Sequence, residues 1–173
     1  MRHAFLIIAH NNWGQLKKLI QLLDAENHEI YIHIDKKSKD FMENEFVDIT
    51  KKSKVFIFQE YEVFWGGFSS VQVELFLFEK AYALQYDYYH LISGADLPLK
   101  SNKDIDTFFE RNKGKEFILF DEDKLKNDPE ISRRVKYYHF LQNYRRRFSQ
   151  QWKNDFFTFL ERVSLVFQIL FRV

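Results

Sequence analysis

The stretch FLIIAHNN, residues 5–12, decides the fold class, because a continuous apolar run changes there to polar residues. A run such as Phe5 to His10 is typical of a strand that is buried on both faces. It is too short for the apolar core of a signal peptide. Asn11 and Asn12 then predict a turn or a helix cap. We therefore expect a first strand in the interior of a sheet, with His10 at its carboxyl end.

Helix and strand patterns alternate after this strand. Apolar residues at helical spacing predict an amphipathic helix over residues 13–24. A short helix is expected near 40–48, another after a cap at Ser69 or Ser70, and another over 102–112, where Ser101 and Asp104 resemble a capping box. The predicted stripe of the helix after the serines consists of Val71, Leu75, Phe78 and Tyr82. Further strands are predicted at residues 29–35, 55–58, 88–93 and 116–120.

This alternation predicts an α/β layer fold with a mainly parallel sheet. Ligands of such open sheets bind outside the carboxyl ends of the strands, which groups His10, Asp35, the loop 64–70 and Asp96. A strand-end carboxylate such as Asp35 can accept hydrogen bonds from a ribose or a uracil N–H, but it can equally cap a turn. His10 also fits a satisfied buried polar group, and Asp96 an ordinary Gly-Asp-Pro turn.

Composition narrows the function classes. The 173 residues suffice for one domain, and 20 Phe with 9 Tyr indicate a thick core, a sugar-stacking site or a partner surface. A net charge of +1 produces no strong positive field, so the charge gives no indication of nucleic-acid binding. The absence of cysteine excludes disulfides, thiol catalysis and Cys-ligated zinc, and it favours a reducing compartment. No run approaches the ~18 apolar residues that a membrane span needs.

Two Asp-x-Asp pairs could hold a divalent cation on a sugar diphosphate. Asp104 and Asp106 lie in the first turn of a predicted helix, where acidic residues favour the dipole, so we interpret them as structural. Asp121 and Asp123 follow the predicted strand 116–120, where a metal pair could bind, or they form a solvated acidic loop.

The character of the chain changes after residue 120. Arg145 to Arg147 fit a solvated face, whereas Arg133 and Arg134 are candidates for a pocket wall. The segment 152–173 is predicted to be helical and carries a large apolar surface. The residues of this surface are Phe156, Phe157, Phe159, Val163, Val166, Phe167, Leu170 and Phe171.

Four strings resemble the core-2/I-branching β-1,6-N-acetylglucosaminyltransferases and the related peptide O-xylosyltransferases, in particular their short bacterial members. The strings are IIAHN (7–11), YIHIDKKS (31–38), VFWGGFSSV (63–71) and YHLISGADLPLK (89–100). Each is weak alone, but four in order and at the right spacing are fairly specific. The resemblance covers about residues 4–120.

The resemblance implies a GT-A fold, a UDP-sugar donor, and transfer to an acceptor hydroxyl with inversion and without a metal ion. The sugar would be N-acetylglucosamine or xylose, and the acceptor a glycan or a lipid-linked molecule. The implied donor-binding residues are His10, Asp35, Trp65, Gly66 and Asp96. The implied acceptor-binding residues are Glu116 and Arg134.

The family's catalytic base and the basic residues that neutralise the diphosphate are expected beyond Val173. We therefore expect a donor-binding domain at 1–120, and at 121–173 the start of the acceptor half of a truncated enzyme. Two alternatives remain: a metal-dependent transferase that uses Asp121 and Asp123, and a non-catalytic module whose aromatic helix docks on a membrane or a partner. The expected location is cytoplasmic, with possible peripheral membrane association and no nucleic-acid partner.

Overall fold

A computed structural model of the chain describes residues 1–64, 66–118, 121, 127–129, 131, 136–144 and 148–171. It divides into two compact units, residues 1–63 with 69–115 and residues 64–68 with 116–173. The strands of the first unit are β1 (His3–Ala9), β2 (His28–Ile34), β3 (Lys54–Phe58) and β4 (Tyr88–Ser93). Its helices are α1 (Trp13–Leu22), the 3-10 helix η1 (Glu43–Phe46), α2 (Phe68–Tyr82) and α3 (Asn102–Arg111).

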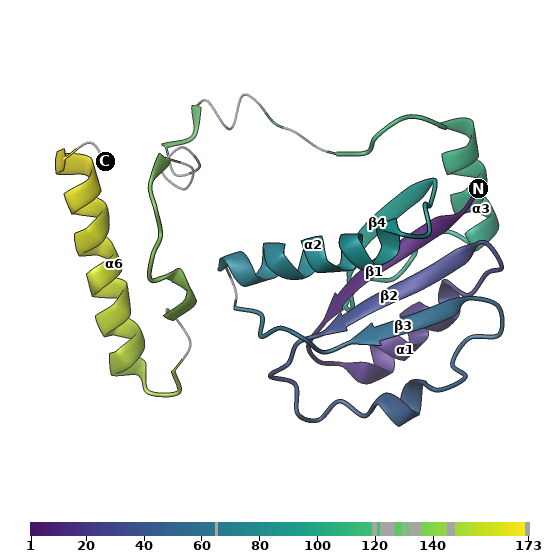
Figure 1. Cartoon of the computed structure of the whole chain (residues 1–173), viewed down its shortest axis with the longest axis horizontal. Helices are drawn as coiled ribbons and strands as arrows, with labels where there is room; N and C mark the ends of the chain where they lie inside the picture. The colour runs from purple at the N-terminus through teal and green to yellow at the C-terminus, as the bar shows by residue number, and fades with distance from the viewer. Residues whose placement is uncertain are drawn as a thin grey trace. The chain divides into compact units, whose positions relative to one another are not determined.

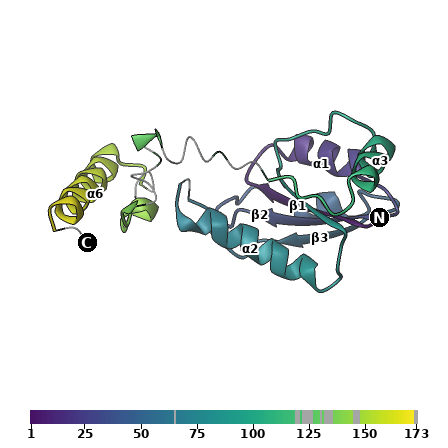
Figure 2. The same ribbon diagram turned by 90° about the horizontal axis from the view of Figure 1, so that it is seen from above.

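The four strands form one parallel sheet in the order β3-β2-β1-β4 (Figure 1). Figure 2 shows α1 and α3 on one side of this sheet and α2 on the other. The chain therefore has the predicted α/β architecture of parallel strands with flanking helices, which fits a GT-A-like fold.

Two apolar layers hold the helices on the sheet. The face toward α1 contains Ile30, Ile32 and Ile34, and the face toward α2 contains Tyr31, as the alternation within β2 predicts. β1 is buried along both faces, because its residues alternate between these two layers. Burying each large aliphatic side chain contributes about 1.5–3 kcal/mol, so these layers stabilise the unit.

The prediction that Ser69 or Ser70 caps α2 was wrong. The helix begins at Phe68, so Ser69 and Ser70 lie within its first turn rather than capping it. The predicted stripe is exposed, whereas a different one faces the sheet. The exposed stripe is Val71, Leu75, Phe78 and Tyr82, and the buried one is Ser69, Val73, Leu77 and Ala81. The helix is apolar on several sides, and the stripe that contains serine and alanine permits a close approach to the sheet.

Other predictions hold with small differences. The helix expected near 40–48 is the four-residue 3-10 helix η1. Ser101 caps α3, because its side chain accepts a hydrogen bond from Asp104 N, which confirms a structural role for Asp104. The predicted strand at 116–120 is wrong for residues 116–118, which have no strand structure. Residues 119–120 lie outside the described residues.

The second unit contains the 3-10 helix η2 (Gln142–Tyr144) and the long helix α6 (Gln151–Phe171). α6 confirms the predicted helix as far as Phe171. An extended stretch lies against it, because Gln168 Oε1 accepts from Tyr138 N at 2.8 Å while Gln168 Nε2 donates to Tyr138 O at 2.9 Å. Among the described helices, none is long and apolar enough to cross a membrane.

Candidate functional site

The polar residues predicted to form a site follow the carboxyl ends of the strands. Because the sheet is parallel, these ends share one edge: Ala9 pairs with Ile34, and Ile8 pairs with Ser93. Loops that follow β1, β2, β3 and β4 therefore meet along this edge, which we call the carboxyl edge. His10, Asp35 and Asp96 all lie there, within the first unit.

Asp35 is the most firmly held of the three. Its side chain is nearly buried, with 6% of the residue exposed. Oδ1 accepts hydrogen bonds from Lys37 N at 3.0 Å and from Val63 N at 3.2 Å, and Oδ2 lies 3.5 Å from Lys37 Nζ. The carboxylate thus joins the loop after β2 to the loop after β3. This is the capping interaction that the sequence left open, and it fixes the carboxylate in one orientation.

Neighbouring side chains tie the same loops together. Ser38 Oγ donates to His10 O at 2.6 Å, which links the ends of β1 and β2. Gln59 Nε2 donates to Ser38 O at 3.0 Å and to Asp35 O at 3.3 Å. The ring of His10 is exposed, so it is not the buried polar group that its strand-end position also fitted. Sequence reasoning missed Gln59, since a glutamine in a loop has no motif that identifies it.

His33 lies on β2, just before the carboxyl edge. The sequence predicted it only as a residue of that strand and gave it no role in the site. Its ring is fully buried, and Nε2 accepts a hydrogen bond from Tyr61 N at 3.1 Å. The proton must then lie on Nδ1, which has no hydrogen-bond partner among the described residues. Burial lowers the pKa of His33, although the carboxylates of Asp35 and Glu60 oppose the shift.

The loop after β4 approaches β1 closely at Gly94. A Cβ atom on Gly94 would lie 2.6 Å from the Cβ atom of Ala9, so a larger residue cannot occupy this position without a shift. Asp96 is exposed, and its Oδ2 accepts a hydrogen bond from Ser93 N at 2.8 Å. Gln15 Nε2 donates to Ala95 O, which holds this turn against the start of α1. Asp96 therefore stabilises this turn, which is the structural role that the sequence offered as an alternative to ligand binding.

The remaining predicted site residues belong to the second unit or lie outside the described residues. Gly66 has a left-handed φ of 73°, in line with the sharp bend that the glycine pair predicted. A Cβ atom at this position would lie 2.8 Å from Gln142 Nε2 of the same unit. Glu116 is exposed. Trp65 and Arg134 lie outside the described residues.

The second Asp-x-Asp pair consists of Asp121 and Asp123. Asp121 is exposed, and Asp123 lies outside the described residues. No metal cluster that includes Asp121 is found among the residues that the structure describes.

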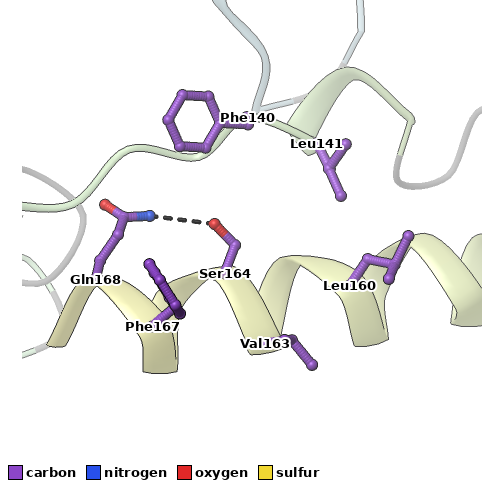
Figure 3. Close-up of a pocket in the computed structure, with 7 residues that line it drawn as sticks. All are labelled: Phe140, Leu141, Leu160, Val163, Ser164, Phe167 and Gln168. Carbon is purple, nitrogen blue, oxygen red and sulfur yellow. Dashed lines mark hydrogen bonds between the residues drawn. The ribbon is translucent and has the colours of Figure 1, made fainter. Parts of the chain in front are cut away.

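The second unit has its own buried polar contacts. Glu161, 2% exposed, accepts from Leu141 N at 2.9 Å and lies 3.0 Å from His139 Nδ1. Both carboxylate oxygens are thus used to hold the segment before η2, so Glu161 is a structural carboxylate here. Figure 3 shows the apolar recess beside it, in which Phe140 and Leu141 face the side chains of α6.

One family model matches most of the chain. It is described as Core-2/I-Branching enzyme, and it matches residues 3–157. The chain belongs to this family. The matched span includes the whole sheet and every predicted site residue, so the core-2/I-branching assignment covers the carboxyl edge described above.

Individual relatives of this core-2/I-branching chain are xylosyltransferases. Xylosyltransferase 2 of Homo sapiens is 26% identical over 125 residues, 68% of this chain and 14% of that protein. Xylosyltransferase 2 of Canis lupus familiaris is 25% identical over 124 residues, with the same coverage. Xylosyltransferase sqv-6 of Caenorhabditis briggsae is 26% identical over 113 residues, 62% of this chain and 14% of that protein. The chain thus spans about one seventh of the length of these relatives.

Proposed function

We propose that this chain carries the nucleotide-sugar-binding part of a glycosyltransferase that moves a sugar from a UDP-sugar to an acceptor hydroxyl. The observation that supports this most is the position of His10, Asp35 and Asp96 at the carboxyl edge of a parallel sheet in a core-2/I-branching chain. Ligands of open α/β sheets bind at that edge.

Asp35 is the residue on which donor binding depends most in this proposal. Two backbone N–H groups fix its Oδ1, and its Oδ2 points to the Lys37 ammonium group. A carboxylate held this way can accept a hydrogen bond from a uracil N–H or a ribose hydroxyl with little loss of side-chain entropy. Lys37 Nζ, which also donates to Val63 O, would shift to admit that ligand or contact it as well.

The proposal includes inversion at the anomeric carbon and no metal ion on the diphosphate, both of which come from the resemblance. The donor sugar is N-acetylglucosamine or xylose; the names of the relatives favour xylose. The acceptor class is a glycan or a lipid-linked molecule, and a chain without cysteine suits a cytoplasmic location.

Nucleotide selectivity tests this proposal. Calorimetric titration with UDP, ADP and GDP in EDTA should give saturable binding of UDP alone. UDP-xylose and UDP-N-acetylglucosamine, titrated in parallel, should then differ in affinity and identify the donor sugar. Equal binding of all three nucleotides would reject a uridine-specific site. Binding of UDP that requires Mn²⁺, and that Asp123→Asn abolishes, would favour the metal-dependent alternative instead.

A second candidate function is a membrane- or partner-binding module, which the surface of α6 favours. Phe159, Phe167 and Leu170 are exposed by 61%, 58% and 72%. The sequence placed Phe157 on this apolar surface, but its side chain is only partly exposed and stacks on Tyr144 and Phe148.

Liposome sedimentation separates the two candidates. The module predicts binding to anionic vesicles, lost when Phe167 and Leu170 are both replaced by serine, and no affinity for UDP. Phe108→Ser, which changes a half-exposed phenylalanine on α3, is the matched control and should leave vesicle binding unchanged. Sedimentation without dependence on Phe167 and Leu170 would reject this role for α6.

A further inference from the structure

A buried polar cluster lies at the amino ends of the strands, opposite the carboxyl edge. His3 and His28 are the first residues of β1 and β2 and are paired in register. Asp106 reaches them from α3. Both histidine side chains are fully buried, and Asp106 is 32% exposed. The donor site proposed above uses none of these residues.

Three ligand atoms converge in this cluster. Asp106 Oδ1 lies 2.9 Å from His28 Nε2 and 3.5 Å from His3 Nε2, and all three atoms lie within 4.8 Å of one another. Zinc with bonds of about 2.0–2.1 Å and tetrahedral geometry places its ligand atoms about 3.3 Å apart. The distances from Asp106 Oδ1 to His28 Nε2 and to His3 Nε2 lie on either side of that value.

Hydrogen bonds outside the cluster fix which nitrogens face inward. His28 Nδ1 lies 2.9 Å from Leu23 O, and since a carbonyl only accepts, Nδ1 carries the proton. His3 Nδ1 shares a hydrogen bond with His90 Nε2 at 2.9 Å. Metal-ligating histidines bind through one nitrogen and use the other in such an outer hydrogen bond, which orients the ring.

One additional proton cannot give hydrogen-bond partners to both His28 Nε2 and His3 Nε2. A proton on His28 Nε2 would pair it with Asp106, but His3 Nε2 would still be buried without a hydrogen-bond partner. A buried polar atom without a partner costs about 1–3 kcal/mol. One divalent cation at the centre would engage all three atoms.

We propose that His3, His28 and Asp106 form a site for a zinc-type divalent cation that fastens α3 to the amino edge of the sheet. Two imidazoles and one carboxylate suit zinc better than magnesium, which prefers oxygen ligands. Water completes the coordination on the side where Asp106 is exposed. The site stabilises the fold and is independent of donor binding at the other edge.

Zinc binding by the purified chain tests the site. After dialysis against EDTA, calorimetric titration should show about one Zn²⁺ per chain and no comparable Mg²⁺ binding. His3→Gln and Asp106→Asn should each weaken Zn²⁺ binding at least about 10-fold, because each removes a ligand. His139→Gln is the matched control, since His139 also lies beside a buried carboxylate, and it should bind Zn²⁺ as the unchanged chain does.

A second measurement uses the unchanged chain and needs no variant. In two-bond ¹H–¹⁵N NMR spectra, Zn²⁺ should shift the Nε2 signals of His3 and His28 and leave those of His33 in place. Absence of Zn²⁺ binding in the unchanged chain would overturn the proposal. So would full retention of binding in both ligand variants, or a shift confined to other histidines.

Discussion

Val63 N donates a hydrogen bond of 3.2 Å to Asp35 Oδ1, across 28 residues of sequence. Together with the Lys37 N–H bond to the same oxygen, it makes one carboxylate the junction of the loops that follow β2 and β3. The shape of the carboxyl edge between β2 and β3 therefore depends on Asp35 even before any ligand binds.

Replacing Asp35 by alanine should destabilise the chain by about 1–3 kcal/mol, because two backbone N–H groups lose their acceptor in a nearly buried position. Urea unfolding followed by circular dichroism measures this change. Asp35→Asn keeps an oxygen acceptor and should lose clearly less. Equal losses in the two variants would show that the hydrogen bonds to Oδ1 do not carry the effect.

Gly94→Ala should destabilise the fold by about 1–3 kcal/mol, because the added methyl group would overlap Ala9 on β1. Gly14→Ala is the matched control: nothing lies within 4 Å of its added Cβ, and it lies inside α1. That change should raise stability by about 0.4–1 kcal/mol. Thermal or urea unfolding of both variants checks the opposite signs, and a neutral Gly94→Ala would refute the close approach.

The two faces of α2 predict different costs for one chemical change. Leu77 is fully buried against the sheet, so Leu77→Ala should cost about 2–5 kcal/mol. Leu75 is 58% exposed, so Leu75→Ala should change stability by no more than about 0.5 kcal/mol. The reverse order in urea unfolding would contradict the assignment of Leu77 to the buried face of α2.

His33 should make stability depend on pH in weakly acidic solution. Because burial lowers its pKa in the folded state, the unfolded chain binds the proton first as the pH falls below about 6.5. The contribution of neutral His33 to the free energy of unfolding is therefore fully present above pH 6.5. As the pH falls from there toward the folded pKa, this contribution declines by at most about 1.4 kcal/mol per pH unit. Urea unfolding at several pH values should give a shallower slope for His33→Gln. An identical slope would exclude His33 as a source.

The sequence predicted the parts of the fold that depend on periodicity alone. The continuous apolar run of β1 and the alternation within β2 each predicted a strand, and the order of strands and helices along the chain predicted that these strands are parallel. The face of α2 was not predictable in this way, because apolar residues such as Leu75 and Leu77 lie on both sides of that helix. The side that packs contains Ser69 and Ala81, whose small side chains permit a close approach to the sheet.

For the candidate site, the edge was predictable but the contacts were not. The rule for open sheets placed Asp35 and Asp96 at the carboxyl edge from their positions after strands. The pairing of Asp35 with Val63 depends on how two loops fold back, and no local pattern encodes it. The approach of Asp106 to His28 joins residues 78 apart in sequence and depends on where α3 packs.

UDP affinity in the presence of EDTA tests the central claim most directly, measured for the unchanged chain, Asp35→Asn and the control Asp24→Asn. Asp24 is a matched control, because it also accepts backbone N–H bonds, from Lys51, Lys52 and Ser53. It lies in the loop before β2, and its three donors lie in the loop before β3, at the opposite edge of the sheet. The account predicts saturable binding by the unchanged chain and by Asp24→Asn, and binding at least about 10-fold weaker in Asp35→Asn. No binding at millimolar UDP, or equal affinity in all three proteins, would contradict it.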